Sequence, residues 1–228
     1  MNLSAIIVAA GSGQRMGGSL KKQYQLLNGK PIFVHSLHIF YSMPGFHDVI
    51  LVIPPGDKAK VERYLLDYAP LKEVKLAEGG VTRQQSVAKG LLLLNKKSDI
   101  VCIHDAVRPF ATTALLKILV ESACQYGAAI PVLPLTDTIK IVSSAGYVED
   151  TPPRDKLYAV QTPQAFQTTL LVEAYENAVE KGYEFTDDAA IVEKYGFSVF
   201  TVPGEAENIK ITNPYDLTFA LSLFKERS

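Results

Sequence analysis

The sequence lacks the features that mark several large classes of protein. Its 228 residues carry 23 basic and 24 acidic side chains, a formal net charge of −1. This balance argues against a nucleic-acid coat or a polybasic membrane anchor. No apolar run approaches the roughly eighteen residues of a membrane span, and the N-terminal run is too short, and lacks the charged flank, for a signal peptide. We therefore expect a cytoplasmic protein, or one of the plastid stroma if a transit peptide has been removed.

Cysteine is scarce, and the sequence has no metal-binding pattern of Cys and His. Cys102 and Cys124 both lie in apolar segments, which favours buried free thiols over a disulfide. The sequence also lacks a Gly-x-Ser-x-Gly motif and a Ser/His/Asp arrangement, so nothing indicates acyl transfer. What is present is a chain 47% hydrophobic and long enough to bury roughly 70–75% of its unfolded surface.

Short apolar strands and amphipathic helices alternate along most of the chain. The pattern predicts an α/β fold with a doubly wound, mostly parallel Rossmann-like sheet, whose ligands bind beyond the carboxyl ends of the strands. Pro31 suits a first helical turn, and Thr82 and Thr112 suit helix N-caps. The expected strands are Leu3–Ala9, Val49–Ile53, Val74–Ala77, Ile100–Ile103, Ala128–Leu133, Ser198–Val202 and Asn208–Ile211. The expected helices are Ile32–Tyr41, Lys58–Tyr68, Arg83–Leu94, Thr113–Tyr126, Thr169–Lys181, Asp187–Tyr195 and Tyr215–Lys225.

The alternation breaks between Thr136 and Gln161. Ile139–Val142 and Tyr147–Glu149 read as short strands on either side of a turn, Ser143–Gly146. We expect one domain, residues 1–228, with a β-hairpin arm at about 136–160. A two-stranded hairpin is marginally stable alone in water, so we expect a second subunit to cover the arm in a homodimer. A solvated excursion is the alternative.

The first expected strand runs directly into a basic, glycine-rich loop. Gly11 and Gly13 let backbone N–H groups approach an anion, and Arg15 and Lys22 supply positive charge, which suits a triphosphate. Met16 stands where the dinucleotide fingerprint needs its third glycine, and the Gly-Lys-Ser/Thr of the ATPase P-loop is missing. The alternatives are an ordinary strand-to-helix turn and, for the lysine, a solvated surface residue.

Further polar residues follow other expected strands. Asp105 ends an apolar strand and is suited to hold Mg²⁺ or to cap a turn, and Arg108 is suited to grip an anionic substrate. For His104 we favour a structural role over that of a base. The Gly79–Arg83 segment opens a helix and suits an anion or nucleobase contact, or is a plain loop with a Thr cap.

Three polar residues complete the candidate set. Thr162 lies in a Gln-Thr-Pro-Gln segment. Thr186 precedes two acids and equally suits a helix N-cap. Lys210 lies between two isoleucines in a short β-like run, where an outward-facing lysine is the alternative.

Eight short motifs, each present once, follow one another from end to end of the chain. Together they make the sequence resemble the 2-C-methyl-D-erythritol 4-phosphate cytidylyltransferases of the non-mevalonate isoprenoid pathway. The motifs are Ala9-Ala10-Gly11-x-Gly13-x-Arg15-Met16, Lys22-Gln23-Tyr24, Gly79-Gly80-x-x-Arg83-x-x-Ser86-Val87, His104-Asp105-Ala106-x-Arg108-Pro109, Asp137-Thr138-Ile139-Lys140, Gln161-Thr162-Pro163-Gln164, Thr186-Asp187-Asp188 and Asn208-Ile209-Lys210-Ile211-Thr212.

The resemblance implies transfer of CMP from CTP to the phosphate of methylerythritol phosphate, with Mg²⁺ as cofactor and pyrophosphate as the second product. It implies catalytic roles for Arg15, Lys22 and Lys210, and Mg²⁺ ligation by Asp105. The nucleotide-binding positions it implies are Ala10, Gly11, Gly13, Gly80, Arg83 and Ser86. The positions it implies for the second substrate are Asp105, Arg108, Thr162 and Thr186, with Thr138 and Arg154 reaching the neighbouring subunit's site.

Two residues depart from the family pattern. Val81 stands where many members carry an acidic residue. With Val107, the segment His104–Phe110 is similar to the corresponding segment of the ribitol-5-phosphate cytidylyltransferases, which makes ribitol 5-phosphate the alternative substrate. The sequence offers two alternatives from other classes of function. A nicotinamide-dependent oxidoreductase is disfavoured by Met16 and by Ile53-Pro54-Pro55, where an acid should end the second strand. A non-catalytic nucleotide-binding module stays open.

Overall fold

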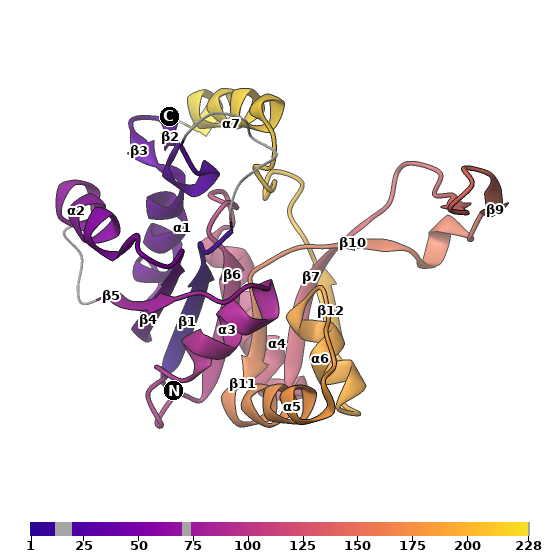
Figure 1. The fold of residues 1–228 in the computed structure, drawn as a ribbon, viewed down its shortest axis with the longest axis horizontal. Helices are drawn as coiled ribbons and strands as arrows, with labels where there is room; N and C mark the ends of the chain where they lie inside the picture. Colours follow the sequence, from indigo (N-terminus) through magenta and orange to yellow (C-terminus); the bar gives the residue numbers. More distant parts are fainter. Residues whose placement is uncertain (12–19, 70–73, 228) are drawn as a thin grey trace.

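A mostly parallel sheet forms the centre of the protein in the structure, a computed structural model that describes residues 1–11, 20–69 and 74–227 (Figure 1). The strands run in the order β10-β7-β11-β6-β1-β4-β5, with β12 beside β7. β11 lies antiparallel between β6 and β7, and β10 is antiparallel to β7. The strands are β1 (Leu3–Val8), β4 (Phe46–Ile53), β5 (Val74–Glu78), β6 (Ile100–Asp105), β7 (Ala128–Pro134), β10 (Tyr158–Val160), β11 (Gln164–Gln167) and β12 (Phe200–Pro203).

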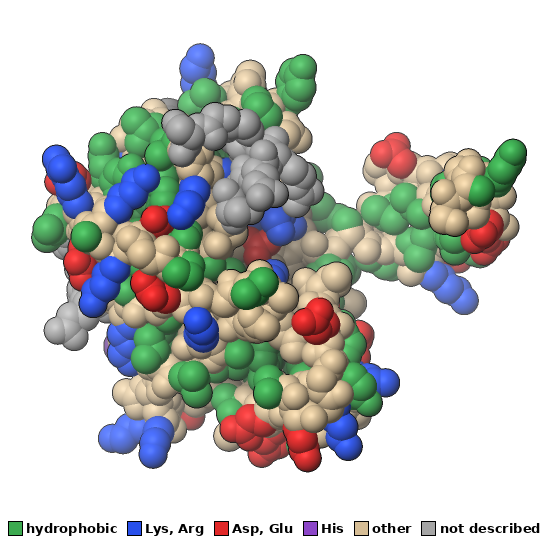
Figure 2. All heavy atoms as spheres, viewed as in Figure 1, with side chains coloured by type: hydrophobic (Ala, Val, Ile, Leu, Met, Phe, Trp, Pro, Cys, Tyr) green, Lys and Arg blue, Asp and Glu red, His purple; other side chains and the backbone are tan. Residues whose placement is uncertain are grey.

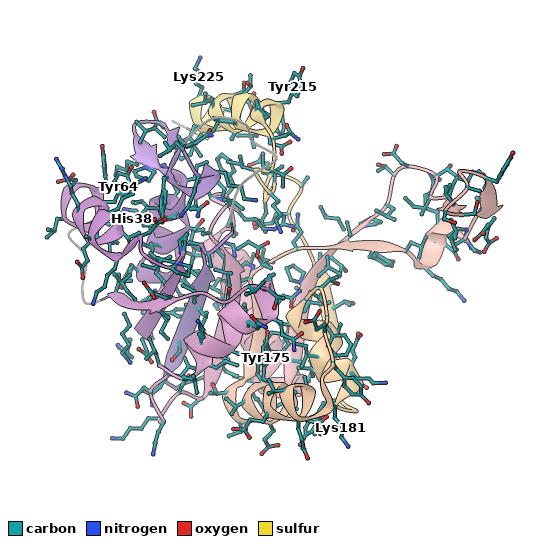
Figure 3. The ribbon with its side chains drawn as sticks, viewed as in Figure 1. His38, Tyr64, Tyr175, Lys181, Tyr215 and Lys225 are labelled. Atoms are coloured by element: carbon teal, nitrogen blue, oxygen red, sulfur yellow. The ribbon has the colours of Figure 1, made fainter. Side chains whose placement is uncertain are left out.

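Helices cover both faces of this sheet, as the alternating pattern predicts. One apolar cluster packs Phe33, Val61 and Leu116 from α1, α2 and α4 against one face. A second packs Val87 and Leu171 from α3 and α5, with α6, against the other. Tyr175 on α5 is buried, whereas Lys181 at the end of that helix is exposed (Figure 3). The helices are α1 (Ile32–Tyr41), α2 (Lys58–Tyr68), α3 (Arg83–Leu91), α4 (Thr113–Tyr126), α5 (Thr168–Lys181), α6 (Asp188–Lys194) and α7 (Pro214–Arg227).

The N-termini of two helices have the predicted capping residues, and those of two others differ from prediction. Thr82 and Thr112 cap α3 and α4, accepting from the backbone N–H groups three residues on, at 3.1 Å each. Thr186 does not cap α6, because Asp187 accepts from Ala190 N at 3.0 Å instead. Pro31 lies at the N-cap of α1 rather than inside its first turn.

The arm projects from the body of the molecule (Figure 1). It carries the two-stranded hairpin β8 (Ile141–Val142) and β9 (Val148–Asp150), then the short helix η3 (Arg154–Lys156), and returns to the sheet through β10. Hydrophobic side chains gather over the arm (Figure 2), and Tyr147 is 76% exposed. The hairpin is shorter than predicted, but the predicted projection is confirmed.

Several local features differ from expectation. Cys102 and Cys124 are both free thiols, but only Cys102 is buried, since Cys124 lies on the exposed side of α4. The segment before α1 forms short elements that the sequence did not predict, η2 (Lys22–Tyr24), β2 (Leu26–Leu27) and β3 (Lys30–Pro31). Within the described ranges, no helix is both long and apolar enough to cross a membrane.

Candidate active site

A cavity of about 560 Å³ opens beyond the carboxyl ends of β1, β4 and β6. This is the edge at which open α/β sheets bind ligands, because the loops that follow neighbouring parallel strands converge there. The residues that line the cavity are Val8, Ala9, Ala10, Gly11, Lys21, Lys22, Gln23, Pro54, Pro55, Gly80, Val81, Thr82, Arg83, Ser86, Asp105, Val107 and Lys210.

Many of the residues singled out in the sequence meet in this cavity. They are Ala10, Gly11, Lys22, Gly80, Arg83, Ser86, Asp105 and Lys210. Gly13 and Arg15 lie outside the described residues. The remaining candidates, Arg108, Thr138, Arg154, Thr162 and Thr186, do not line the cavity.

Gln23 joins the lysine pair to the end of β1. Its Nε2 donates to the carbonyl oxygens of Ala9 and Gly11, at 2.6 and 3.1 Å, and the side chain is 1% exposed. These two hydrogen bonds, one buried and one partly buried, fix the position of η2 relative to the strand. Sequence reasoning missed this role, although Gln23 lies inside the Lys-Gln-Tyr motif.

The opposite wall is built from closely packed backbone. A Cβ on Gly79 would lie 2.3 Å from the Cβ of Ala10, so only glycine fits there. Ser86 Oγ accepts from Gly80 N at 3.1 Å and donates to Thr82 O at 2.9 Å. The wall therefore presents backbone groups and a fixed hydroxyl, which suits recognition of a nucleobase.

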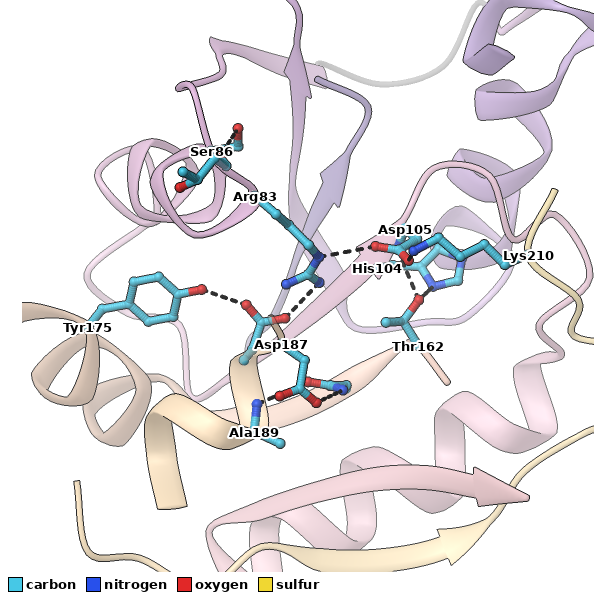
Figure 4. A network of polar contacts seen from close by, with 12 residues as sticks. Arg83, Ser86, His104, Asp105, Thr162, Tyr175, Asp187, Ala189 and Lys210 are labelled. Atoms are coloured by element: carbon cyan, nitrogen blue, oxygen red, sulfur yellow. Dashed lines mark hydrogen bonds and ion pairs between the residues drawn. The ribbon is translucent and has the colours of Figure 1, made fainter. Parts of the chain in front are cut away.

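Asp105 is held between two cations at the base of the cavity (Figure 4). Its Oδ2 lies 2.7 Å from Lys210 Nζ, and its Oδ1 lies 3.3 Å from Arg83 Nε. Burial raises the pKa of Asp105, but the charges of Arg83 and Lys210 outweigh burial and hold that pKa well below its usual range. The carboxyl group is therefore ionised at neutral pH.

Arg83 bridges two carboxylates. Its Nη2 lies 2.8 Å from Oδ2 of Asp188, a residue with no exposed surface, and Tyr175 Oη donates to Oδ1 of Asp188 at 2.5 Å (Figure 4). This geometry places the guanidinium against the protein's own carboxylates. Sequence reasoning did not assign Asp188, because its contact with Arg83 joins positions 105 residues apart in the chain, and it did not assign Tyr175, which binds Asp188.

Lys210 reaches Asp105 from a loop. The predicted strand Asn208–Ile211 does not form, but Ile211 N donates to Val107 O at 2.9 Å, which fixes this segment beside the loop after β6. Asn208, fully buried, donates from Nδ2 to Thr162 O at 2.9 Å. The alternative of an outward-facing lysine is therefore wrong.

His104 and Thr162 support the Asp105 backbone. His104 Nε2 lies 3.0 Å from Arg108 O, and because a carbonyl only accepts, Nε2 carries the proton. Burial lowers the pKa of His104 to about 4, so the ring is neutral and its Nδ1 accepts from Thr162 Oγ1 at 3.1 Å. Thr162 Oγ1 in turn accepts from Asp105 N at 3.0 Å. The predicted structural role of His104 is confirmed.

Arg108 turns toward the loop before Lys210, where its Nη1 donates to Asn208 O at 2.7 Å. Its Nε is buried and has no acceptor among the described residues. Thr186 is exposed directly before α6. Thr138 and Arg154 lie on the arm, away from the cavity of their own subunit.

The donor set fits one mode of magnesium binding. Among the described residues, no three His, Cys, Asp or Glu side chains converge as in an all-protein metal site. Mg²⁺ is commonly held by one or two carboxylates together with substrate phosphates. The ionised Asp105, which faces the cavity, fits that mode.

Comparison with known proteins agrees with this geometry. The family profile described as 2-C-methyl-D-erythritol 4-phosphate cytidylyltransferase matches residues 3–226. The protein of that name from Geobacillus thermodenitrificans is 43% identical over 227 residues, covering 100% of this chain and 99% of the relative. The Syntrophus aciditrophicus protein of the same name is 42% identical over 223 residues, covering 97% of this chain and 95% of that protein.

Solved structures of enzymes from the same family also match this chain. The crystal structure of the Anaerococcus prevotii 4-diphosphocytidyl-2C-methyl-D-erythritol synthase matches with a TM-score of 0.85 and 33% identity, covering 98% of each chain. The Thermus thermophilus 2-C-methyl-D-erythritol 4-phosphate cytidylyltransferase matches with a TM-score of 0.79 and 34% identity, covering 99% of this chain and 100% of that one. The chain therefore belongs to the 2-C-methyl-D-erythritol 4-phosphate cytidylyltransferase family.

Proposed function

We propose that this protein transfers CMP from CTP to 2-C-methyl-D-erythritol 4-phosphate, giving 4-CDP-2-C-methyl-D-erythritol and pyrophosphate. The observation that carries the proposal is the gathering of Lys21, Lys22, Lys210 and the ionised Asp105 in one cavity of a chain that matches the family from end to end. Such a cluster suits two polyanionic substrates brought together at one point.

The reaction needs positive charge more than it needs a base. A phosphate monoester has a second pKa of about 6, so the attacking oxygen is already ionised at neutral pH. That oxygen bonds to the α-phosphorus of CTP, and the bond from this phosphorus to the β-phosphate oxygen breaks, releasing pyrophosphate. Lys22 and Lys210, with Arg15, hold the triphosphate and stabilise the charge that develops at the α-phosphorus.

The two substrates occupy different parts of the site. Ala10, Gly11, Gly80 and Ser86 surround the cytidine, with backbone groups reading the base. For the sugar phosphate we assign Asp105, Arg108, Thr162 and Thr186. The buried Nε of Arg108, which has no acceptor among the described residues, supports an anionic partner for that side chain. Thr162 acts through its support of the Asp105 backbone.

Magnesium fits this scheme through Asp105. When bound, Mg²⁺ would neutralise phosphate charge and so favour departure of pyrophosphate. Asp105 is the residue that would hold it together with the substrate phosphates. Arg83 keeps its ion pair to the same carboxylate and thereby orients it.

The arm completes the proposal as a dimer contact. The apolar side chains on β8 and β9 are about half exposed, with Ile141 at 48%, Val142 at 53% and Val148 at 59%. An isolated hairpin with such a surface needs a partner. We assign that partner to a second copy of the chain, so that Thr138 and Arg154 reach the neighbouring subunit's sugar-phosphate site.

A side-by-side assay of the two sugar phosphates tests the proposal. Pyrophosphate release is expected only when CTP, Mg²⁺ and 2-C-methyl-D-erythritol 4-phosphate are all present. Ribitol 5-phosphate is the second candidate because Val107, the residue similar to the ribitol enzymes, lines the cavity. Faster release with ribitol 5-phosphate would overturn the substrate, and CTP binding without turnover on either would favour a non-catalytic module.

A further inference from the structure

The aspartate in front of helix α2 does not cap that helix. Asp57 occupies the N-cap position, yet within the part of the chain that the structure describes its side chain makes no capping hydrogen bond. Aspartate is among the residues most favoured at an N-cap because its oxygen accepts from the first turn. The carboxylate of Asp57 is therefore engaged elsewhere.

That carboxylate binds the segment that carries the lysine pair. Lys21 Nζ lies 2.7 Å from Oδ2 of Asp57, and Tyr24 Oη donates to the same oxygen at 2.8 Å. Burial raises the pKa of Asp57, but hydrogen bonds from Lys21 and Tyr24 and the charges of Lys21 and Lys60 together lower it. The charged Asp57 thus binds two residues that flank Lys22 in the sequence, Lys21 before it and Tyr24 after it.

One of the two groups bound by Asp57 is rigid. Tyr24 is 1% exposed, its ring packs 6.0 Å from Phe33 and 5.7 Å from Tyr64, and Lys60 Nζ lies 4.6 Å above it. Tyr64 is labelled on α2 in Figure 3. The other group, Lys21, is a long side chain at the rim of the cavity with 35% of its surface exposed. Asp57 therefore holds the long, partly exposed Lys21 side chain beside the aromatic cluster of Tyr24, Phe33 and Tyr64.

Asp57 also links two walls of the cavity. It follows Pro54 and Pro55, which line the cavity as the lysine pair does, and Asp57 N donates to Pro54 O at 3.2 Å. The turn between them is held by Gly56 N, which donates to Glu78 Oε1 at 2.9 Å. The Asp57 carboxylate thus connects the Pro54–Pro55 segment to the Lys21–Tyr24 segment at the cavity.

We propose that Asp57 is a positioning residue for the triphosphate of CTP, acting through Lys21 and the η2 segment; the identity of this ligand rests on the function proposed above. Without the carboxylate, the Lys21 side chain regains its rotamer freedom, and its ammonium group loses its ion-pair partner and is solvated by water instead. The neighbouring Lys22 ammonium is then less well placed, and part of the preorganised charge is lost.

Simple Coulomb attraction makes the opposite forecast. Removing a negative charge near a polyanion site should strengthen CTP binding. Lys21 and Asp57 are both partly exposed, at 35% and 20%, so water screens that long-range effect. Positioning is expected to dominate, and the sign of the change in KM for CTP decides between the two.

Steady-state kinetics of Asp57→Ala and Asp57→Asn test the proposal. We expect the KM for CTP to rise on the order of tenfold in Asp57→Ala and less in Asp57→Asn, which retains an acceptor for Tyr24. The KM for the sugar phosphate should stay within about twofold, which a general loss of structure would not spare. Asp67→Ala is the matched control, because Asp67 lies on the same helix, is exposed and pairs only loosely with Arg63 at 3.8 Å.

A double-mutant cycle makes the test specific to the contact. Asp57→Ala should add little in a Lys21→Met background, because the two residues act as one unit. Additive effects, an equal rise in both KM values, or an unchanged or lower KM for CTP would each overturn the positioning role. If the wild-type protein turns over its substrates while Asp57→Ala matches it, only this inference fails; if the wild type shows no turnover, the proposed function fails first.

Discussion

Charge at the level of single residues explains why the cavity suits phosphate transfer. Asp105 remains ionised because Arg83 and Lys210 each hold one of its oxygens. Arg83 is itself neutralised by Asp188, so its charge serves to orient Asp105. Lys22 and Lys210 are the cations that we assign to the phosphates.

Replacing either lysine should remove activity without unfolding the protein. Lys22→Ala and Lys210→Ala are each expected to lower kcat by on the order of 10²–10³, because each removes a preorganised cation. Circular dichroism and the thermal midpoint should stay near those of the wild type, since Lys210 is 39% exposed. Lys117→Ala, on the exposed side of α4, is the control. Near-normal rates would contradict the assigned roles.

The buried His104 should make stability depend on pH. Its pKa is lowered to about 4 in the folded protein, against 6.5 for an ordinary histidine, so unfolding takes up a proton between those values. The free energy of unfolding should therefore fall as pH drops from 6.5 to 4, by roughly 3 kcal/mol at most from this residue. Urea denaturation across this range measures the slope.

A substitution at the same position isolates the contribution of His104. In His104→Gln the slope should flatten, but not vanish, because burial also lowers the pKa values of His35 and His38. An unchanged slope would show that His104 does not carry the effect.

At the level of elements, the site is a meeting of strand ends and helix starts. The loop after β5 approaches β1 so closely that Gly79 has no room for a side chain. The Thr82 cap opens α3 immediately afterwards and leaves Ser86 to bind the Gly80 backbone. The wall that we assign to the nucleotide, formed by Gly79, Gly80 and Ser86, thus depends on the packing of two elements rather than on any one residue.

Gly79→Ala should distort this wall. The new Cβ would meet Ala10 Cβ at 2.3 Å and Ser86 Oγ at 2.9 Å, so the loop must shift, and we expect at least a tenfold rise in the KM for CTP. Gly90→Ala is a useful comparison, because its Cβ would meet Ile6 Cγ2 at 2.7 Å in the core. That variant should lower the thermal midpoint with little change in the KM for CTP. Equal kinetics in both variants would argue against the wall.

At the level of the whole molecule, we expect the arm to decide which residues share a site. Thr138 and Arg154 lie on the arm, remote from the cavity of their own subunit. If two chains associate through their arms, each site is composite.

Mixed dimers of Arg154→Ala and Lys22→Ala should recover activity. In such a dimer one site combines both defects, while the other has an intact lysine and an intact neighbouring arm. Each variant alone should be nearly inactive, and coexpression with separately tagged chains should restore part of the pyrophosphate release. Absence of any rescue would show that the arm serves its own subunit or none.

Local pattern predicted most of the scaffold and the edge at which the site lies. The parallel strands, the helices on both faces, the arm and the caps at Thr82 and Thr112 follow from periodicity and capping chemistry. The antiparallel strand β11 was missed, because Gln164–Gln167 is too short to show an alternation. The exposure of Cys124 was also missed, since an apolar neighbourhood in sequence does not fix which side of a helix faces the core.

The sequence by itself determined the fold class and, through its ordered motifs, the family, and it predicts a phosphate-binding loop after the first strand. Only the tertiary structure decided which charges meet. Lys210 binds Asp105, 105 positions earlier in the chain, and Arg83 binds the distant Asp188. Asp57 binds Lys21 instead of capping α2. The physical reason is that periodicity and capping act over a few residues, whereas an ion pair depends on where the sheet brings its loops together.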